Sequence, residues 1–374
     1  MIIGIDGNEA NIKIKVGVNQ YAYQLLWELY RLNISLNNRN NFIIYLKSPP
    51  REDLPSQTEF WNYKILPGNR LWIIHRLMPQ LWKAPRPDIF FSPSHYLPLL
   101  APIPKVFTLH DLGYLVFSDQ FKKYDYWQLK YWTAISIIIS KYIIAVSESS
   151  KKDIVRHYPF ASKKISVIYH GYKKELFNSK IPNDVVRRVK KKYKIDTDYI
   201  LFLSTLKPSK NVEGLLEAYS SLDKLLGDVK LVISGKKGWL YKTIFEKVEL
   251  LHLEKKVIFT DYVTEKEKAA LIKGARLFIL PSFWEGFGMD VVNSMACGTP
   301  VVISNIGSLP EIGGRAAIFV DPYNIKSISD GIRQVFSMKA KEYNKRVKMC
   351  LNQAKKFSWE KCAEETLRIL EKAK

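Results

Sequence analysis

The stretch RLFILPSFWEGFGMDVVNSMACGTPVVISN, residues 276–305, predicts two buried strands joined by a loop and one short helix. Its ends contain the continuous apolar runs LFIL and VVIS, which are typical of strands covered on both faces. Between them, residues from about Met289 to Cys297 have helical character, and Gly298 followed by Pro300 is a helix stop signal. A strand, a helix and a second strand in this order favour a parallel β-α-β unit.

The same alternation of apolar runs and helical segments recurs in both halves of the chain. The runs are MIIGID, NFIIYL, IFFSPS, KVFTLHD, YIIAVS and ISVIYHG in the first half, and YILFLST, VKLVISG, KVIFTD, RLFILPS and PVVISN in the second. Strand signals lapse over residues 171–198, where charged residues become frequent. The pattern predicts two doubly wound α/β domains with parallel sheets.

The composition is that of a folded, strongly basic chain. Its 374 residues exceed the usual size of one domain, and 47% hydrophobic residues with 13% aromatics exclude a mostly disordered protein. A net charge of +22 indicates a potential that attracts phosphates, nucleic acid or an anionic membrane. Cys297, Cys350 and Cys362 lack CxxC or histidine spacing, which argues against a disulfide framework or a zinc site.

The chain shows no sequence pattern of a secretory signal or a membrane span. MIIGIDGNEANIK lacks a basic segment followed by a long apolar one, and WTAISIIISKYIIAVS is interrupted by Lys141. We therefore expect a cytoplasmic protein. Peripheral contact with the cytosolic membrane face is a hypothesis, because RLWIIHRLMPQLWKAPRP and FKKYDYWQLKYW interleave basic and aromatic residues. Such aromatics also serve core packing.

The loop in front of the predicted helix has the composition of an anion or sugar site. Helix N-termini expose unsatisfied N–H groups, so the backbone around Phe287, Gly288 and Met289 is suited to hold an anion or sugar hydroxyls. Glu285 precedes this turn and is placed to accept hydrogen bonds in the same space. Read locally, such a glycine-containing loop is equally consistent with turn chemistry alone.

The residue order EGFGMDVVNSMACGTPVV resembles the donor-site signature of retaining glycosyltransferases of the GT-B type, family four. The resemblance implies that Glu285 contacts the donor sugar. Asn293 stands where the family has a second Glu that binds the nucleotide ribose, and Asp290 replaces a proline. An amide still hydrogen-bonds a hydroxyl, but without the charge of a carboxylate.

Other segments extend the resemblance over nearly the whole chain. STLKPSKNVEGLLEAY is similar to a family element whose basic residues neutralise the donor diphosphate; Lys210 matches its Lys, and Lys207 could supply the charge of an Arg that is absent. VGVNQYAYQLLWELYRL places Gly17 at the family's glycine-rich entry to the first helix, close to the diphosphate. VFTLHDLGYLVF places His110 at the transferring sugar and Asp111 near the acceptor.

The resemblance implies a GT-B fold of two Rossmann-like domains facing a cleft. We expect an acceptor-side domain over residues 1–175, a nucleotide-sugar domain over 176–355, and a terminal helix over 356–374 that crosses back to the first domain. His110, Glu285 and Lys210 are the expected catalytic residues. Gly17, Lys207, Lys210, Phe287, Gly288, Met289 and Asn293 are the expected donor-binding residues, and Asp111 lies on the acceptor side.

The expected function is transfer of a sugar, with retention, from a nucleotide-sugar co-substrate to a glycan or lipid-linked glycan in polysaccharide or glycolipid biosynthesis. GDP-mannose is the first choice of donor and UDP-sugars are the second. We expect no metal and no cofactor, and no nucleic-acid partner, since no recognition motif is present. The alternatives are another enzyme of this architecture, such as an epimerase or phosphorylase, and a non-catalytic binding protein whose donor site degenerated at Asn293.

Overall fold

The computed structural model describes residues 1–69, 71–118 and 123–374. They divide into two compact units: unit 1 comprises Met1–Gly171 and Ser358–Lys374, and unit 2 comprises Tyr172–Phe357. The chain therefore leaves unit 1 at Gly171 and returns to it at Ser358.

Among the described residues, unit 1 is built on a seven-stranded parallel sheet in the order β3-β2-β1-β4-β5-β6-β7. Its strands are β1 (Ile2–Asp6), β2 (Asn41–Leu46), β3 (Trp61–Ile65), β4 (Ile89–Ser92), β5 (Lys105–Leu109), β6 (Tyr142–Ala145) and β7 (Ile165–Val167). Its helices are α1 (Val18–Ser35), the π-helix η1 (Ile73–Leu77), α2 (Met78–Leu81), α3 (Gly113–Val116), α4 (Lys123–Ile139), α5 (Glu148–His157), the 3₁₀ helix η3 (Pro159–Lys164) and α15 (Trp359–Ala373).

Unit 2 repeats the arrangement with a six-stranded parallel sheet, counted over the part of the chain that the structure describes, in the order β10-β9-β8-β11-β12-β13. Its strands are β8 (Tyr199–Leu203), β9 (Lys230–Ser234), β10 (Val257–Asp261), β11 (Leu277–Leu280), β12 (Val301–Ser304) and β13 (Ile318–Val320). Its helices are α6 (Asn183–Lys192), η4 (Pro208–Lys210), α7 (Val212–Ser220), α8 (Asp223–Leu226), α9 (Lys242–Leu250), α10 (Glu265–Gly274), α11 (Met289–Ala296), α12 (Leu309–Gly313), η5 (Gly314–Ala316), α13 (Ile325–Phe336) and α14 (Ala340–Ala354).

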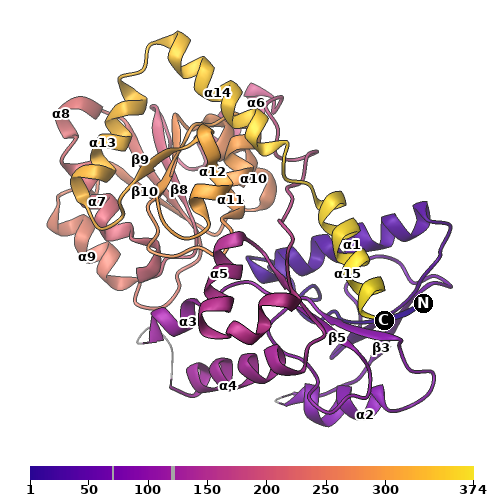
Figure 1. Ribbon diagram of the computed structural model, residues 1–374. Coiled ribbons are helices and arrows are strands. Elements are labelled where there is room, and N and C mark those ends of the chain that lie inside the picture. The colour runs from indigo at the N-terminus through magenta and orange to yellow at the C-terminus, as the bar shows by residue number, and fades with distance from the viewer. Residues whose placement is uncertain (70, 119–122) are drawn as a thin grey trace. The chain divides into compact units, whose positions relative to one another are not determined.

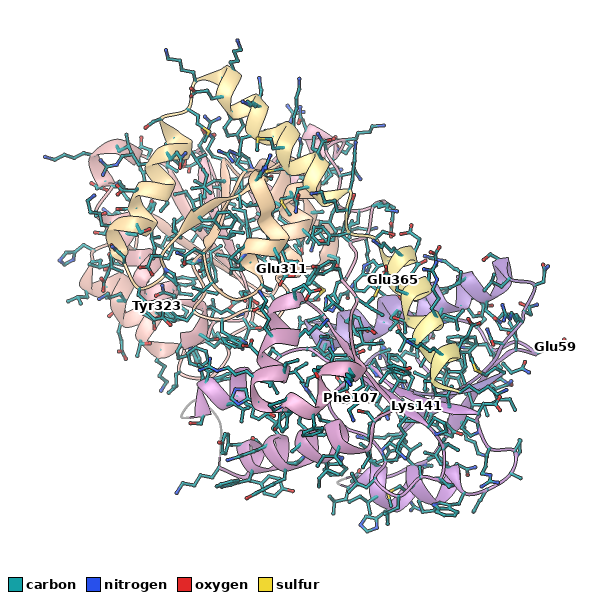
Figure 2. All side chains as sticks on the ribbon, viewed as in Figure 1. Glu59, Phe107, Lys141, Glu311, Tyr323 and Glu365 are labelled. Carbon is teal, nitrogen blue, oxygen red and sulfur yellow. The ribbon has the colours of Figure 1, made fainter. Side chains whose placement is uncertain are left out.

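The central strands explain the continuous apolar runs of the sequence. Every residue of β4, β5, β8, β11 and β12 is buried, because helices cover both faces of each sheet. Phe107 of β5, labelled in Figure 2, is one of the large side chains with no exposed surface. The predicted strands are all present, while β3 and β13 were not predicted from the sequence.

Each sheet has a point where the strand order reverses, between β1 and β4 in unit 1 and between β8 and β11 in unit 2. Segments that follow such neighbouring strands diverge, and ligands of open α/β sheets bind at this edge. The loops after these four strands are therefore the first places to look for a site.

The C-terminal helix α15 completes unit 1 and packs beside α1, as the yellow and indigo ribbons show (Figure 1). Trp359 at its start stacks on His170, with ring centroids 5.6 Å apart. A Cβ added at Gly171 would lie 2.0 Å from the backbone nitrogen of Trp359. Glycine is thus required where the outgoing and returning chains of unit 1 meet.

Candidate functional site

Two charged side chains of unit 2 lie in the segments that follow the strands at its reversal point. β8 leads into η4, which ends at Lys210, and β11 leads into the loop that contains Glu285. The two segments are joined directly, because the Phe283 N–H donates a 2.9 Å hydrogen bond to the carbonyl of Ser209.

Lys210 and Glu285 form an ion pair in this place. The Lys210 Nζ lies 2.6 Å from Glu285 Oε1, and the side chains are 10% and 14% exposed. The hydroxyl of Ser282 donates to the same carboxylate oxygen at 3.2 Å. Low exposure reduces solvent screening, so the two charges interact more strongly than a surface pair does.

The backbone of Glu285 is held by the segment that follows β12. Ser308 donates to the Glu285 carbonyl from its N–H at 3.3 Å and from its hydroxyl at 3.0 Å. Gly307 has φ +64°, and a Cβ there would approach the same carbonyl oxygen to 3.2 Å. Gly288 has φ +91°, and its Cβ would lie 2.8 Å from Leu309. These glycines permit the close approach that fixes the Glu285 loop.

The residues at the start of α11 differ in what they offer a ligand. Gly288 is the N-cap residue, and Met289 opens the helix. The ring of Phe287 is buried and meets Phe357 edge to face, with centroids 5.8 Å apart. The side chain of Phe287 therefore belongs to the core, and its contribution to a site would come from its backbone.

Asn293 lies one turn inside α11 and is joined to Asp290. Its Nδ2 donates a 3.0 Å hydrogen bond to Asp290 Oδ1, and Lys268 Nζ lies 3.3 Å from the same oxygen. Lys268 also pairs with Glu265 at 3.0 Å. Burial lowers the pKa of Lys268, but the two carboxylates outweigh it and hold the pKa above its usual value. Lys268 is thus a permanently charged cation in contact with Asp290 of the Asp290–Asn293 pair.

Lys207 takes a different direction from Lys210. It precedes η4, and its Nζ lies 4.9 Å from the ring centroid of Trp239. This cation–π contact holds its ammonium at an indole face. Lys207 and Lys210, assigned together from the sequence, therefore have different surroundings.

In unit 1, His110 follows β5 and is buried among other rings. Its ring centroid lies 6.1 Å from that of His95, 5.7 Å from that of His170 and 4.8 Å from that of Tyr21. Burial, assisted by His95, lowers the pKa of His110 to about 4. Its Nε2 lies 2.9 Å from the carbonyl of Pro93. Because a carbonyl only accepts, the neutral ring carries its proton on Nε2 and keeps an acceptor at Nδ1.

Asp111 and Gly17 have local structural roles. Asp111 Oδ1 accepts a 2.7 Å hydrogen bond from the Gly113 N–H, at the start of α3. Gly17 is the N-cap residue of α1 with φ +52° and ψ −119°, a conformation that favours glycine. A Cβ there would meet nothing within 4 Å, so the backbone at Gly17 borders open space.

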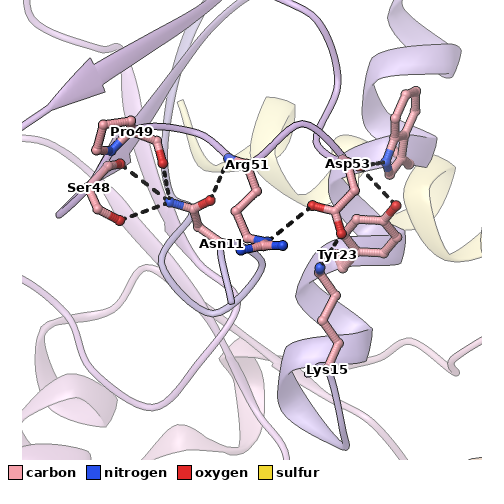
Figure 3. Close-up of polar contacts among 8 residues, drawn as sticks. Asn11, Lys15, Tyr23, Ser48, Pro49, Arg51 and Asp53 are labelled. Atoms are coloured by element: carbon pink, nitrogen blue, oxygen red, sulfur yellow. Dashed lines mark hydrogen bonds and ion pairs between the residues drawn. The ribbon is translucent and has the colours of Figure 1, made fainter. Parts of the chain in front are cut away.

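The segment between β1 and Gly17 is tied to the segment after β2 (Figure 3). Asn11 donates to the Pro49 carbonyl at 3.0 Å and accepts from the Arg51 N–H at 2.9 Å. Lys15 pairs with Asp53 at 2.5 Å. These contacts fix the approach of the chain to the first helix.

Comparison with known proteins places the chain in a family. A model described as Glycosyl transferases group 1 matches residues 185–357, and one described as Glycosyltransferase Family 4 matches residues 17–176. O-antigen chain mannosyltransferase B of Escherichia coli is 31% identical over 281 residues, which are 75% of this chain and 73% of that protein. The chain belongs to the group 1 glycosyltransferases.

Two further similarities concern length and fold. Serotype-specific mannosyltransferase WbdA of Escherichia coli is 29% identical over 225 residues, 58% of this chain but 27% of that protein. The structure of Anabaena HepE in complex with UDP-glucose has a TM-score of 0.77 at 17% identity, covering 99% of each chain. The second likeness confirms the predicted fold, in which both units of the glycosyltransferase are Rossmann-like with parallel sheets.

The structure brings together some of the residues assigned from the sequence of this glycosyltransferase. Lys210 and Glu285, given separate roles, form one pair, and Asn293 is joined to Asp290. Three contributing residues were not assigned from the sequence: Ser282, Ser308 and Lys268. Ser282 and Ser308 come shortly after β11 and β12, so the strand-end rule could have found them. Lys268 lies within α10, where a lysine gives no such signal.

No helix within residues 1–69, 71–118 and 123–374 is long and apolar enough to cross a membrane. The same residues contain no group of three or more His, Cys, Asp or Glu side chains that could hold a metal ion.

Proposed function

We propose that this glycosyltransferase moves a hexose from a nucleotide sugar to a glycan or lipid-linked glycan, with retention of anomeric configuration and without a metal ion. GDP-mannose is the donor we favour, because the relatives compared above are named as mannosyltransferases. UDP-sugars come second, because a protein of the same fold was solved with UDP-glucose.

The Lys210–Glu285 pair carries this proposal. When the bond between the anomeric carbon and the phosphate oxygen breaks, negative charge grows on the leaving diphosphate. Lys210 and the positive N-terminal end of α11 offer charge to stabilise it. This is the electrostatic task that a metal ion performs in other transferases.

Glu285 has two tasks in this scheme. In the free enzyme its carboxylate keeps the Lys210 ammonium at a defined position, 2.6 Å away. With donor bound, the diphosphate shares the Lys210 charge, and Glu285 accepts hydrogen bonds from hydroxyls of the donor sugar. The N–H and the hydroxyl of Ser308 both donate to the main-chain carbonyl of Glu285 and hold the backbone that carries this carboxylate.

We assign retention of the anomeric configuration to a same-face displacement. The acceptor hydroxyl bonds to the anomeric carbon on the face from which the phosphate leaves, and the hydroxyl proton passes to the departing phosphate oxygen. His110, neutral at physiological pH because burial lowers its pKa to about 4, contacts a hydroxyl of the transferring sugar through its Nδ1 acceptor. Asp111 is assigned to the acceptor side.

Asn293 is assigned to the nucleotide ribose together with Asp290. The Asn293 amide donates to Asp290, which leaves its carbonyl oxygen to accept from a ribose hydroxyl. Lys268 balances the carboxylate of Asp290. A paired and charge-balanced arrangement argues for a rebuilt donor site, and against the non-catalytic alternative.

We assign the positive charge of the chain to phosphate groups of the donor and to anionic lipid, and not to nucleic acid. The enzyme would then act at the cytoplasmic face of a membrane, where it would meet a lipid-linked acceptor. No cofactor besides the nucleotide-sugar co-substrate is needed for the proposed transfer.

A thermal-shift and hydrolysis screen tests the proposal. The protein is mixed with GDP, UDP, ADP and their common sugar conjugates, with and without EDTA. We expect one nucleotide family to raise the melting temperature, with release of sugar that EDTA does not change. Lys210→Ala should lose both effects, and Lys255→Ala, at an exposed lysine before β10, should keep them. No response to any nucleotide would favour the non-catalytic alternative.

A further inference from the structure

Helix α4 of unit 1 exposes its apolar side chains in a single stripe. Its exposed apolar residues recur every three or four positions and are 39% to 64% exposed: Tyr124, Trp127, Tyr131, Ile135 and Ile138. The opposite side of the helix buries the hydroxyls of Thr133 and Ser136 completely. Ile137 is buried in the core of unit 1 and Leu129 packs against it, so α4 carries apolar side chains on its exposed side as well as on its buried side. A helix that faces water normally carries polar residues on its exposed side.

The stripe continues into a groove formed with the segment that precedes α2 and with Leu99, which lies between β4 and β5. Leu71, Ile74 and Leu99 face α4 residues across it, and the groove has a volume of about 350 Å³. The rings of Trp127 and Tyr131 stack along it, with centroids 5.3 Å apart. We call the stripe and the groove together the α4 surface. Apolar patches of this kind mark interaction sites.

Basic residues are frequent in the two segments that contribute most of the α4 surface. Residues 71–86 and 123–141 hold six lysines and arginines against one acid, Asp125: Arg76, Lys83, Arg86, Lys123, Lys130 and Lys141. The ammonium of Lys130 lies 5.0 Å from the ring centroid of Trp127, so charge and aromatic surface are interleaved. Trp82, which directly precedes Lys83 in the first of these segments, is also exposed.

We propose that the α4 surface docks this glycosyltransferase on an anionic lipid bilayer. Trp and Tyr rings favour the headgroup level of a bilayer, aliphatic side chains enter below it, and Lys and Arg remain among the phosphates. Each basic residue near such a surface contributes about 1 kcal/mol of attraction. The excess of positive charge is complementary to phosphate and disfavours a face-to-face contact with a second copy of the chain.

The inference rests on the proposed function in one respect, since it explains where a lipid-linked acceptor would be met. A docked enzyme searches for an anchored acceptor along a surface, which raises the effective concentration of the acceptor. The docking itself depends only on the α4 surface, so it is measurable without any sugar donor.

Sedimentation with vesicles tests the proposal. The full chain is mixed with vesicles of phosphatidylcholine alone or with phosphatidylglycerol added, at low and high salt. We expect binding to the anionic vesicles at low salt, weaker binding at high salt and little binding to the neutral ones. The double variant Trp127→Ser/Tyr131→Ser should bind at least tenfold more weakly. Leu250→Ser removes a leucine that is 69% exposed on unit 2 and should bind like the wild type.

Separate measurements distinguish the outcomes. Melting curves show that the variants are folded, and the nucleotide thermal shift should be the same in all of them, whether or not they dock. Failure of the wild type to sediment with anionic vesicles, or equal sedimentation of the double variant, overturns the proposal while leaving the transferase activity open. A wild-type dimer in size-exclusion chromatography that the double variant abolishes would assign the α4 surface to self-association instead.

Discussion

The ammonium nitrogen of Lys210 lies 2.6 Å from Oε1 of Glu285, and this pair joins the segments that follow β8 and β11. Both side chains are largely shielded from water, so removing one charge leaves the other poorly solvated. The two residues therefore act as a unit. A substitution at either position changes the electrostatics of the site and the stability of its loops together.

Glu285→Gln is expected to lower kcat by about 10²-fold or more, because the site loses a charge that positions Lys210. The variant keeps the shape of the side chain but leaves the Lys210 charge with a neutral partner, so the free energy of unfolding should fall by about 3–5 kcal/mol. Steady-state kinetics with the responding nucleotide sugar and urea unfolding measure the two effects.

The matched control is Glu249→Gln, at an exposed position near the end of α9. It changes the same charge at a distance from both loops and should leave kcat and stability unchanged. A Glu285→Gln enzyme with wild-type kcat would remove Glu285 from the proposed mechanism.

Asn293→Glu is expected to weaken nucleotide binding when made alone. The substitution removes the amide that donates to Asp290 and puts a second carboxylate beside it. In Asp290→Pro/Asn293→Glu the repulsion is absent, and proline is tolerated in the first turn of a helix. We expect the double variant to bind better than Asn293→Glu, with a coupling energy of about 0.5–3 kcal/mol measured by calorimetric titration of the nucleotide. Additive effects of the two substitutions would show that the positions are independent.

The strands missed from the sequence share a physical reason. β3 and β13 are edge strands, and in the sequence WNYKI and IFV they lack the long apolar run of a central strand. Lys64 and Ile65 of β3 are exposed, because an edge strand is only partly covered. The central strands, buried on both faces, were all recognisable from apolar runs alone.

The sequence predicted which residues belong to the candidate site better than it predicted the contacts between them. Motif order placed Lys210 and Glu285 near a donor, but a sequence does not show that two side chains from separate loops meet at 2.6 Å. The change at Asn293 looked like a loss until the structure showed its bond to Asp290. Lys268 of α10 pairs with Asp290 and so joins the Asp290–Asn293 pair. The spacing of these residues along the chain does not predict this contact.

Stability is expected to fall as the pH drops below about 6.5. The pKa of His110 in the folded chain is about 4, below the usual histidine value of 6.5, because burial disfavours the charged ring. Between these two values the unfolded chain binds a proton and the folded chain does not, so the free energy of unfolding falls by up to about 1.4 kcal/mol per pH unit for one such group. Burial shifts the pKa of His95 and His170 in the same direction.

Urea unfolding of the wild type and of His110→Asn between pH 7.5 and 4.5 checks this expectation. The variant has no titrating group at position 110, so its stability should decline less steeply across the window. Parallel curves for the two proteins would mean that His110 titrates alike in the folded and unfolded chains.

Gly171→Ala is expected to destabilise unit 1 by about 3 kcal/mol or more, because its methyl group would overlap backbone atoms that cannot move without displacing α15. The control is Gly227→Ala, where φ is +55° and a Cβ meets nothing within 4 Å. That change adds backbone strain alone, because a residue with a Cβ rarely adopts φ +55° with ψ −117°; such strain costs about 1–3 kcal/mol. Melting temperatures of the two variants measure the difference, and a loss at Gly171 no larger than that at Gly227 would show that the returning chain is not packed against Gly171 in solution.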